Sequence, residues 1–269
     1  MKILEIKVLK GPNYWSVRRP KLVQMKLDLE EMEQRPTNTI PGFRERLENM
    51  LPTMVEHRCS EEVRGGFFNR VDEGTWMGHV IEHIALEIQT LAGMDTGFGR
   101  TRTAEGEKEG IYYVVFSYME EDAGAYAAKA AVQITQAIID GVEYDLAHDI
   151  QQMREIREDT RLGPSTGCIV DEAAKRGIPF IRLNKQSLVQ LGYGVNQKRI
   201  RATIASTTSN IAVDIAGNKE ETKLLLGSAE IPVPKGTVIR SEEELDGAIE
   251  KVGFPLVIKP IDGNHGKGN

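Results

Sequence analysis

Hydrophobic positions recur at the spacing of a helix or a strand through most of the first 160 residues. The clearest case is residues 75–92, where apolar side chains return every three or four positions and predict an amphipathic helix. Thr75 can cap the start of this helix and Gly93 can end it. Residues 18–35 mix apolar and charged positions and predict no particular element. The other predicted elements are helices at 43–55, 122–139 and 145–159 and strands at 2–9 and 111–118.

The pattern changes near residue 160, where short helices begin to alternate with short strands. The predicted helices cover 168–176, 218–227 and 242–251, and the predicted strands cover 178–182, 208–215, 237–240 and 255–259. Such alternation is typical of an α/β domain. We therefore predict an α+β domain at 1–160 and an α/β domain at 161–269, which is expected to be incomplete because the chain ends in a glycine-rich loop.

Composition narrows the functional classes. Of the 269 residues 40% are hydrophobic, which is too many for a disordered chain. The formal net charge is -6 and the Lys and Arg residues form no basic block, which argues against a general nucleic-acid binder. No uncharged stretch is long enough to span a bilayer, and two cysteines are too few for a secreted disulfide scaffold. We expect a cytoplasmic protein with neither a nucleic-acid nor a membrane partner.

A group of polar side chains interrupts the apolar helix predicted at 75–92. His79 and His83 are four positions apart and share one helix face, so they can bind one metal ion. Glu82 lies on the same side and can act as a general base toward water. The pattern H-x-x-E-H is that of the inverted zincins and predicts a Zn²⁺-dependent hydrolytic site. The alternative is a polar helix face that binds no metal.

A three-ligand zinc site needs one further carboxylate or thiolate. Inverted zincins similar to pitrilysin take a glutamate from a later helix, and the helix predicted at 145–159 offers Glu155 and Glu158. Glu158 lies nearer the apolar stripe and is predicted as the third ligand, whereas Glu155 is expected to face water. Cys59, beside His57, is the competing ligand, unless it is simply a buried cysteine.

Two lysines and a glycine-rich loop in the second half have the chemistry of a phosphate site. Lys219 opens a predicted helix, and Lys259 ends a predicted strand that runs into the loop at 262–269. A lysine at a strand end can point at phosphates, and the N–H groups of a loop can wrap them. Each feature alone is also common elsewhere, because such lysines are usually solvent-exposed and such loops are usually turns.

Taken in order along the chain, these features resemble the ATP-grasp family. The resemblance rests on Asn218-Lys219, on Ile231-Pro-Val-Pro and on Val257-Ile-Lys-Pro. It implies that Lys219 and Lys259 contact ATP. The loop is then similar to the lid over the phosphates, with glycines at Gly263, Gly266 and Gly268.

The match extends to the cyanophycin synthetase family over nearly the whole chain. The motifs that carry it are HRCS (57–60), GTWMGHVIEHIALE (74–87), RLGPSTG (161–167), ASTTSNIAVDIAGNKEETK (205–223) and KPIDGNHGKG (259–268). This family makes a polymer with an aspartate backbone and an arginine on each side-chain carboxylate. The resemblance implies ATP and Mg²⁺ as cofactors, ligation through an acyl phosphate, an aspartate/arginine peptide substrate and a homotetrameric assembly.

The same resemblance suggests residues that contact the substrate. His265 in the glycine-rich loop is expected to hold the acceptor's carboxylate or the transferring phosphate. Ser165 and Thr166 are expected to bind a peptide backbone, unless they serve only a turn. The chain stops before the rest of the ATP-grasp domain, its magnesium-binding carboxylates and the Mur-ligase-like domain that adds arginine. Ligation by this chain alone is therefore not expected.

Three functions remain open at this point. The first is a peptide ligase, of which this chain is the N-terminal part. The second is a zinc metallopeptidase domain that cuts the polymer and generates primers for the ligase. The third is a module that binds the polymer without chemistry. The first two can coexist in one protein.

Overall fold

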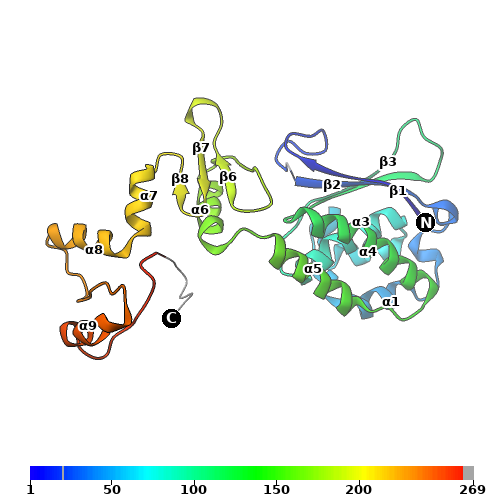
Figure 1. Ribbon diagram of the computed structural model, residues 1–269. Coiled ribbons are helices and arrows are strands. Elements are labelled where there is room, and N and C mark those ends of the chain that lie inside the picture. The colour runs from blue at the N-terminus through cyan, green and yellow to red at the C-terminus, as the bar shows by residue number, and fades with distance from the viewer. Residues whose placement is uncertain (20, 263–269) are drawn as a thin grey trace. The chain divides into compact units, whose positions relative to one another are not determined.

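The computed structural model describes residues 1–19 and 21–262. Contacts between Cα atoms divide the chain into two compact units, Met1–Arg161 and Leu162–Asn269, beside the boundary predicted near residue 160. The first unit runs from blue to green in Figure 1 and the second from green to red. None of the helices in the described ranges combines the length and the apolar character needed to cross a membrane.

An antiparallel four-stranded sheet in the order β1-β2-β4-β3 forms the framework of the first unit (Figure 1). Its strands are β1 (Lys2–Lys10), β2 (Lys21–Asp28), β3 (Gly99–Thr103) and β4 (Ile111–Ser117). The central strands β2 and β4 pair from Leu22 to Asp28 of β2, with Met25 opposite Val114. Because each central strand has a neighbour on both sides, its backbone groups are satisfied and its apolar residues are mostly buried.

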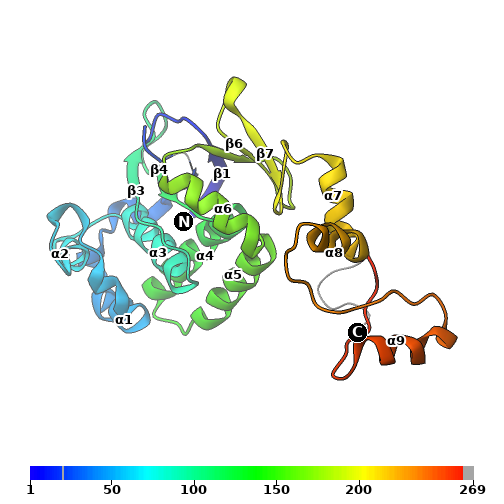
Figure 2. The same cartoon turned by 90° about the vertical axis from the view of Figure 1, so that its left-hand side faces the viewer.

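Helices cover one face of this sheet, as Figures 1 and 2 show. The helices α3 (Met77–Leu91) and α4 (Glu121–Asp140) pack against each other, and α3 also contacts β3 and β4. The helix α5 (Leu146–Thr160) packs against both of them. The shorter helices α1 (Phe43–Met50) and α2 (Gly66–Glu73) contact each other and complete the helical layer.

The core of the first unit lies between the sheet and the helices. It includes the fully buried side chains of Leu27 and Phe116 from the sheet and of Ile81 from α3. Burying a side chain of this size contributes about 1.5–3 kcal/mol. Small residues let α4 approach the sheet closely, since a Cβ atom at Gly124 would lie 2.7 Å from the Cβ of Tyr118.

Most of the elements predicted for the first unit are present. The helices predicted at 43–55, 75–92, 122–139 and 145–159 are α1, α3, α4 and α5, and the predicted strands are β1 and β4. The undecided segment 18–35 contains β2, and the pattern does not reveal α2 or β3. Short 3-10 helices in both units are η1 (Glu30–Gln34), η2 (Thr37–Thr39), η3 (Pro52–Glu56), η4 (Cys59–Glu61), η5 (Gly194–Asn196) and η6 (Glu242–Glu244).

The ends of α3 differ in part from the expectation. Thr75 does not cap the helix, which begins after Trp76 without a side-chain cap. The Thr75 hydroxyl instead lies 3.0 Å from Nδ1 of His79. Gly93 follows the helix with φ of +83°, a left-handed conformation that glycine adopts easily at a helix end.

The second unit begins with α6 (Pro164–Lys175) and a small antiparallel sheet. The strands pair in chain order and are β5 (Phe180–Arg182), β6 (Leu188–Leu191), β7 (Lys198–Arg201) and β8 (Ile204–Ala205). Val170 of α6 packs with Val189 and Ile200 in a small core. The helices that follow are α7 (Asn210–Gly217), α8 (Lys219–Ser228) and α9 (Leu245–Val252).

The expected alternation of helices and strands is wrong after β8. The segment 208–215, predicted as a strand, lies largely in α7, because Ser209 caps that helix by accepting a hydrogen bond from the N–H of Ala212. Residues 237–240 and 255–259 do not form the predicted strands, since neither pairs with another strand within 1–19 and 21–262. The predicted strand 178–182 is β5, and the predicted helices are α6, α8 and α9. The second unit is therefore a mixed fold with an antiparallel sheet.

Candidate metal centre

Helix α3 brings two histidines to one face. The ring centroids of His79 and His83 are 4.8 Å apart. His83 is buried and His79 is half-buried, and both line a pocket of about 750 Å³. Phe67 of α2 stacks on the His83 ring with a centroid distance of 4.1 Å, so packing holds this ring in place.

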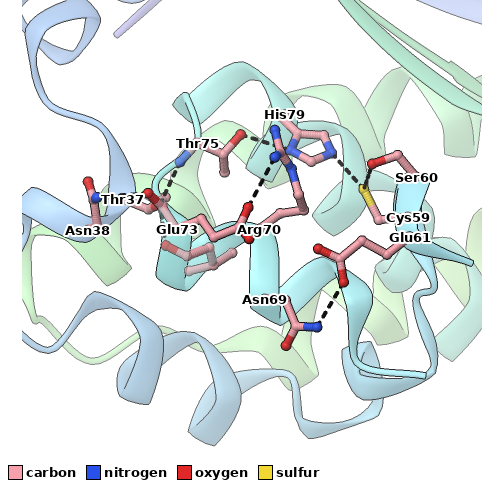
Figure 3. A network of polar contacts seen from close by, with 11 residues as sticks. Thr37, Asn38, Cys59, Ser60, Glu61, Asn69, Arg70, Glu73, Thr75 and His79 are labelled. Atoms are coloured by element: carbon pink, nitrogen blue, oxygen red, sulfur yellow. Dashed lines mark hydrogen bonds and ion pairs between the residues drawn. The ribbon is translucent and has the colours of Figure 1, made fainter. Parts of the chain in front are cut away.

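Cys59 reaches the two histidines from η4. Its Sγ lies 3.4 Å from Nε2 of His79, and Figure 3 shows the two side chains pointing toward each other. One ligand atom each from Cys59, His79 and His83 can be chosen so that all lie within 4.8 Å of one another. The backbone of Cys59 has φ of +52°, an uncommon conformation for a residue other than glycine that recurs at functional sites.

Close packing against α2 holds the cysteine loop in place. A Cβ atom at Gly66 would lie 2.2 Å from the carbonyl oxygen of Arg58, so only glycine fits beside this loop. The N–H of Phe67 also donates to the carbonyl oxygen of His57 at 3.1 Å. The sequence at 65–67 therefore lets the loop approach closely enough to bring its cysteine to α3.

The three donors fit a zinc ion. Two imidazole nitrogens and one thiolate sulfur are common Zn²⁺ ligands, and catalytic zinc sites keep a fourth position open. With bond lengths of about 2.0–2.3 Å, tetrahedral zinc ligands lie roughly 3.5 Å apart. The 3.4 Å between Sγ of Cys59 and Nε2 of His79 agrees with this separation.

Burial keeps both histidines uncharged. Burial and then the charge of Arg70 lower the pKa of His79 to about 4. Burial and then the neighbouring His79 and His57 hold the pKa of His83 well below its usual value. Because a histidine must be neutral to offer a lone pair to a metal ion, this electrostatic setting suits ligands.

Each of the two histidines also has a polar partner at Nδ1. The Thr75 hydroxyl contacts Nδ1 of His79, as Figure 3 shows. Nδ1 of His57 lies 2.8 Å from Nδ1 of His83. Such outer contacts orient metal-binding rings and select their tautomer.

Glu82 lines the same pocket and has a strongly perturbed acidity. Burial raises its pKa to about 7, against the opposing effects of Thr101 and Arg100. The Thr101 hydroxyl donates to its carboxylate at 2.6 Å. A Cβ atom at Gly99 would lie 2.2 Å from Oε1 of Glu82, so the glycine leaves room for the carboxylate. A carboxyl group with a pKa near neutrality suits general acid–base catalysis.

The structure does not bring Glu158 to this cluster. Helix α5 meets α3 at the end of α3, where Arg154 donates to the carbonyl oxygen of Leu91 at 2.9 Å. Glu158 is exposed and forms an ion pair with Arg161 at 2.8 Å, and Glu155 is exposed as predicted. Among the described residues, the group able to hold a metal is Cys59, His79 and His83. Cys59, the competing ligand candidate, therefore lies beside the two histidines, and Glu158 does not.

The sequence pattern does not assign several polar residues to this site. Glu87 has a sequence signal, because it follows His83 by four positions and extends the same helix face. Thr101 has none, since only the pairing of β3 with β4 brings it beside Glu82. His57 is noticeable only as a neighbour of Cys59 in the sequence.

The candidate nucleotide-binding lysines lie in the second unit. Lys219 opens α8, and its Nζ donates to the carbonyl oxygen of Ile261 at 3.2 Å. Asn218 forms an isolated antiparallel bridge with Asp262. Lys259 is exposed in an irregular segment. Lys219 and the segment that follows Lys259 therefore lie side by side.

The remaining predicted site residues fall into two groups. Ser165 and Thr166 lie in the first turn of α6 and not in a loop, because the helix begins at Pro164. Ser165 is exposed, whereas Thr166 is 2% exposed and is not available to a ligand. The others lie outside the described residues and are Gly263, His265, Gly266 and Gly268.

Comparison with known proteins points to one family. Residues 24–140 match the family model of the cyanophycin synthase-like N-terminal domain. The chain is 53% identical over 272 residues to the cyanophycin synthetase of Geminocystis herdmanii, across 100% of this chain and 31% of that protein. It is also 53% identical to the cyanophycin synthetase of Trichormus variabilis, across 100% of this chain and 30% of that protein.

A more distant similarity involves a second ligase. The alpha-aminoadipate–LysW ligase LysX of Sulfolobus acidocaldarius is 31% identical over 123 residues, across 37% of this chain and 45% of that protein. The chain spans about 30% of the length of the cyanophycin synthetases that it matches. The resemblance predicted from the sequence motifs is confirmed, because the similarity extends over both structural units.

Proposed function

We propose, from the 53% identity to cyanophycin synthetases along the whole chain, that this protein is the N-terminal part of such a synthetase. The synthetase would use ATP to build an aspartate/arginine polymer in the cytoplasm, as a homo-oligomer. The extent of the identity carries this proposal, because it includes both units and not one motif alone. The similarity to a second ligase supports the same chemistry.

In this proposal the second unit is the start of an ATP-grasp domain. Lys219 and Lys259 would hold the phosphates of ATP. A bound Mg²⁺ ion would offset the negative charge of these phosphates. The terminal carboxylate of the polymer attacks the γ-phosphate, and ADP leaves. The amine of an aspartate then displaces phosphate from the acyl phosphate, and the amide forms. The bridge between Asn218 and Asp262 supports this role, because it draws Lys219 toward the segment after Lys259.

A chimera tests the ligase proposal. We would replace the matching 272-residue region of the Geminocystis herdmanii enzyme with this chain and measure ATP-dependent incorporation of aspartate and arginine. The chimera should be active. Lys219→Ala and Lys259→Ala should each raise the KM for ATP about 10- to 100-fold, the loss expected for a hydrogen bond to a charged group. Lys223→Ala, on the same helix as Lys219, is the matched control. A folded but inactive chimera would contradict the proposal.

The metal-ligand cluster favours a second function in the first unit. We propose that this unit is a zinc-dependent hydrolase that cuts the aspartate/arginine polymer into shorter chains, which the synthetase then extends. The convergence of Cys59, His79 and His83 supports the proposal, because it supplies two nitrogens and a sulfur within 4.8 Å of one another, with 3.4 Å between the sulfur and Nε2 of His79. Glu82 lines the same pocket with a pKa of about 7.

Each residue of this site has a distinct role in hydrolysis. Cys59, His79 and His83 would hold the zinc ion. A zinc ion bound there supplies Lewis acidity toward an amide carbonyl. Glu82 takes a proton from the attacking water and gives it to the leaving amine, which a group with a pKa near neutrality can do at pH 7. The Thr101 hydroxyl orients the carboxylate for both transfers.

Metal analysis and a cleavage assay test the hydrolase. The purified protein should contain about one zinc ion per chain, as expected for a three-ligand site. Cys59→Ser should remove the metal, whereas Cys168→Ser should retain it. Glu82→Gln should keep the metal and abolish cleavage, because an amide cannot accept the proton. Glu158→Gln should change neither the zinc content nor the cleavage activity. If zinc is absent and added zinc produces no cleavage, the first unit is a module that only binds the polymer.

A further inference from the structure

The charged side chains that line the pocket of the metal-ligand cluster do not balance. The lining contains three arginines and two glutamates, namely Arg58, Arg70, Arg100, Glu56 and Glu82. An arginine stays charged at any physiological pH, and the two glutamates supply at most two negative charges. The lining therefore has an excess of positive charge, which favours an anionic ligand.

Two of these arginines have no acidic partner among the described residues. Arg70 pairs with Glu73 at 3.2 Å, as Figure 3 shows, and Glu56 pairs with Arg64 at 2.8 Å. Within residues 1–19 and 21–262, neither of the other two arginines of the lining takes part in an ion pair, and both are exposed. Their guanidinium groups are therefore accessible to an anionic group of a ligand.

The two unpaired arginines lie next to residues of the proposed hydrolytic site. Arg58 directly precedes Cys59 in the sequence. Arg100 precedes Thr101 on β3, and the Thr101 hydroxyl donates to the Glu82 carboxylate at 2.6 Å. A peptide amide that is held between the metal-ligand cluster and Glu82 consequently has an unpaired guanidinium group in its neighbourhood on each of these two elements.

A carboxylate is the anionic group that fits these arginines in a peptide substrate. A guanidinium group presents parallel N–H donors that match the two oxygens of a carboxylate. In an aspartate/arginine polymer, each arginine is joined to an aspartate side chain through its amino group, so its own carboxylate stays free. Every backbone amide of the polymer is therefore flanked by side chains that end in a free carboxylate. The guanidinium groups of the polymer have the wrong charge for this pair of arginines.

We infer that Arg58 and Arg100 are specificity-determining residues that bind the free side-chain carboxylates on either side of the amide to be cut. This inference rests on the proposed hydrolase and names the chemical group that its pocket recognises. Charged residues on an edge strand such as β3 can also serve only to prevent sheets from pairing. That role predicts no preference for a substrate that carries carboxylates.

Cleavage of two matched peptides tests the preference. Both peptides are short aspartate chains with an arginine on each side chain, and in the second peptide every arginine ends in an amide instead of a carboxylate. The wild-type full chain should cleave the first peptide with a kcat/KM about 10-fold or more above that for the second, because only the first offers carboxylates to the arginines.

Substitution of the arginines should remove this preference. In proteins with the zinc content of the wild type, Arg58→Gln and Arg100→Gln should each raise the KM for the first peptide about 5- to 50-fold, as expected for a charged hydrogen bond that water partly screens. The kcat and the cleavage of the second peptide should not change. Arg102→Gln, at an exposed arginine on β3 outside the pocket lining, is the matched control and should have no effect. Equal losses on the two peptides, or no loss, would overturn the inference.

Peptide binding separates this inference from the hydrolase proposal. The first peptide carries a fluorophore, and its affinity for the Glu82→Gln variant of the full chain is measured by fluorescence anisotropy. Adding Arg100→Gln should weaken binding about 5- to 50-fold at low salt and less at about 0.5 M salt, which screens the charges. Unchanged affinity would overturn the inference. A wild-type protein that cleaves neither peptide would contradict the hydrolase proposal, while the binding measurement would still decide the role of Arg100.

Discussion

The two structural units differ most in how they treat apolar side chains. In the first unit, the sheet and the helices share one large core with many fully buried residues. In the described part of the second unit, buried side chains are few and are Thr166, Val170, Ala173, Val189 and Ile200. Later apolar residues of that unit remain open to solvent, such as Ile211, Leu224 and Phe254 with exposed fractions of 72%, 68% and 79%.

The two candidate sites therefore have different physical surroundings. The side chains of the metal site are surrounded by packed atoms, and burial is the main cause of the shifted pKa values of His79, Glu82 and His83. In the second unit, Lys259 lies on the surface in an irregular segment. A site that is held by a core can be prepared before its ligand arrives. The first unit alone has that property among the described residues.

The largest contrast is expected from matched phenylalanine substitutions. Phe116→Ala removes a fully buried ring from the first unit and should lower its free energy of unfolding by about 3–5 kcal/mol. Tryptophan fluorescence follows this unit selectively in urea, since Trp15 and Trp76 both lie in it. Phe254→Ala removes an exposed ring and should change the circular dichroism transition by less than about 0.5 kcal/mol. Equal effects of the two substitutions would contradict the contrast.

The two units should also differ in their sensitivity to proteases, with a smaller effect than that of the phenylalanine substitutions. The second unit should be cut at least about 100-fold faster than the first, because few buried contacts oppose its local opening. Limited proteolysis followed by mass spectrometry should leave a stable fragment that ends near Arg161. Preferential loss of the first unit would contradict this prediction.

Local patterns predict local structure well in this chain and long-range contacts poorly. The histidines on α3 could be placed on one face because helix periodicity alone determines that relation. The choice of Glu158 over Cys59 failed for a different reason. Which loop or helix reaches α3 depends on close packing such as that at Gly66, where a larger residue would meet the backbone of Arg58.

Strands were harder to predict than helices for the same physical reason. The sequence of β3, Gly-Arg-Thr-Arg-Thr, has no apolar alternation, and only its pairing with β4 makes it a strand. The apolar run at 255–259 shows the converse, because it has no pairing partner among the described residues and forms no strand. Helix α7 was mistaken for a strand because its apolar β-branched residues obscured the cap at Ser209.

Alkaline pH should lower the free energy of unfolding of the first unit by an intermediate amount. Burial, followed by Glu121 and Glu120, raises the pKa of Tyr118 to about 12. The unfolded tyrosine ionises near its ordinary pKa of about 10. The contribution of Tyr118 is therefore fully present below pH 10 and is lost as the pH rises through 12, by at most about 1.4 kcal/mol per pH unit.

Urea unfolding at pH 9, 10 and 11, followed by tryptophan fluorescence, measures this loss. Tyr118→Phe should reduce the slope of stability against pH. Tyr193→Phe, at a residue of the second unit that is 61% exposed, is the matched control and should leave the slope unchanged. An unaltered slope in Tyr118→Phe would count against the assigned role of burial at this residue.

The smallest effects should come from a pair of glycine substitutions with opposite signs. Gly141 ends α4 with φ of +68°, and Gly141→Ala should cost the first unit about 1 kcal/mol because a Cβ atom is disfavoured in that conformation. Gly227 lies inside α8, and a Cβ atom added there would meet nothing within 4 Å beyond its own helix, so Gly227→Ala should be neutral or should stabilise α8 by up to about 1 kcal/mol. Tryptophan fluorescence measures the first effect, and circular dichroism measures the second. Stabilisation by Gly141→Ala would show that the end of α4 does not keep its left-handed conformation in solution, and destabilisation by Gly227→Ala would show that α8 packs against a neighbour at that position.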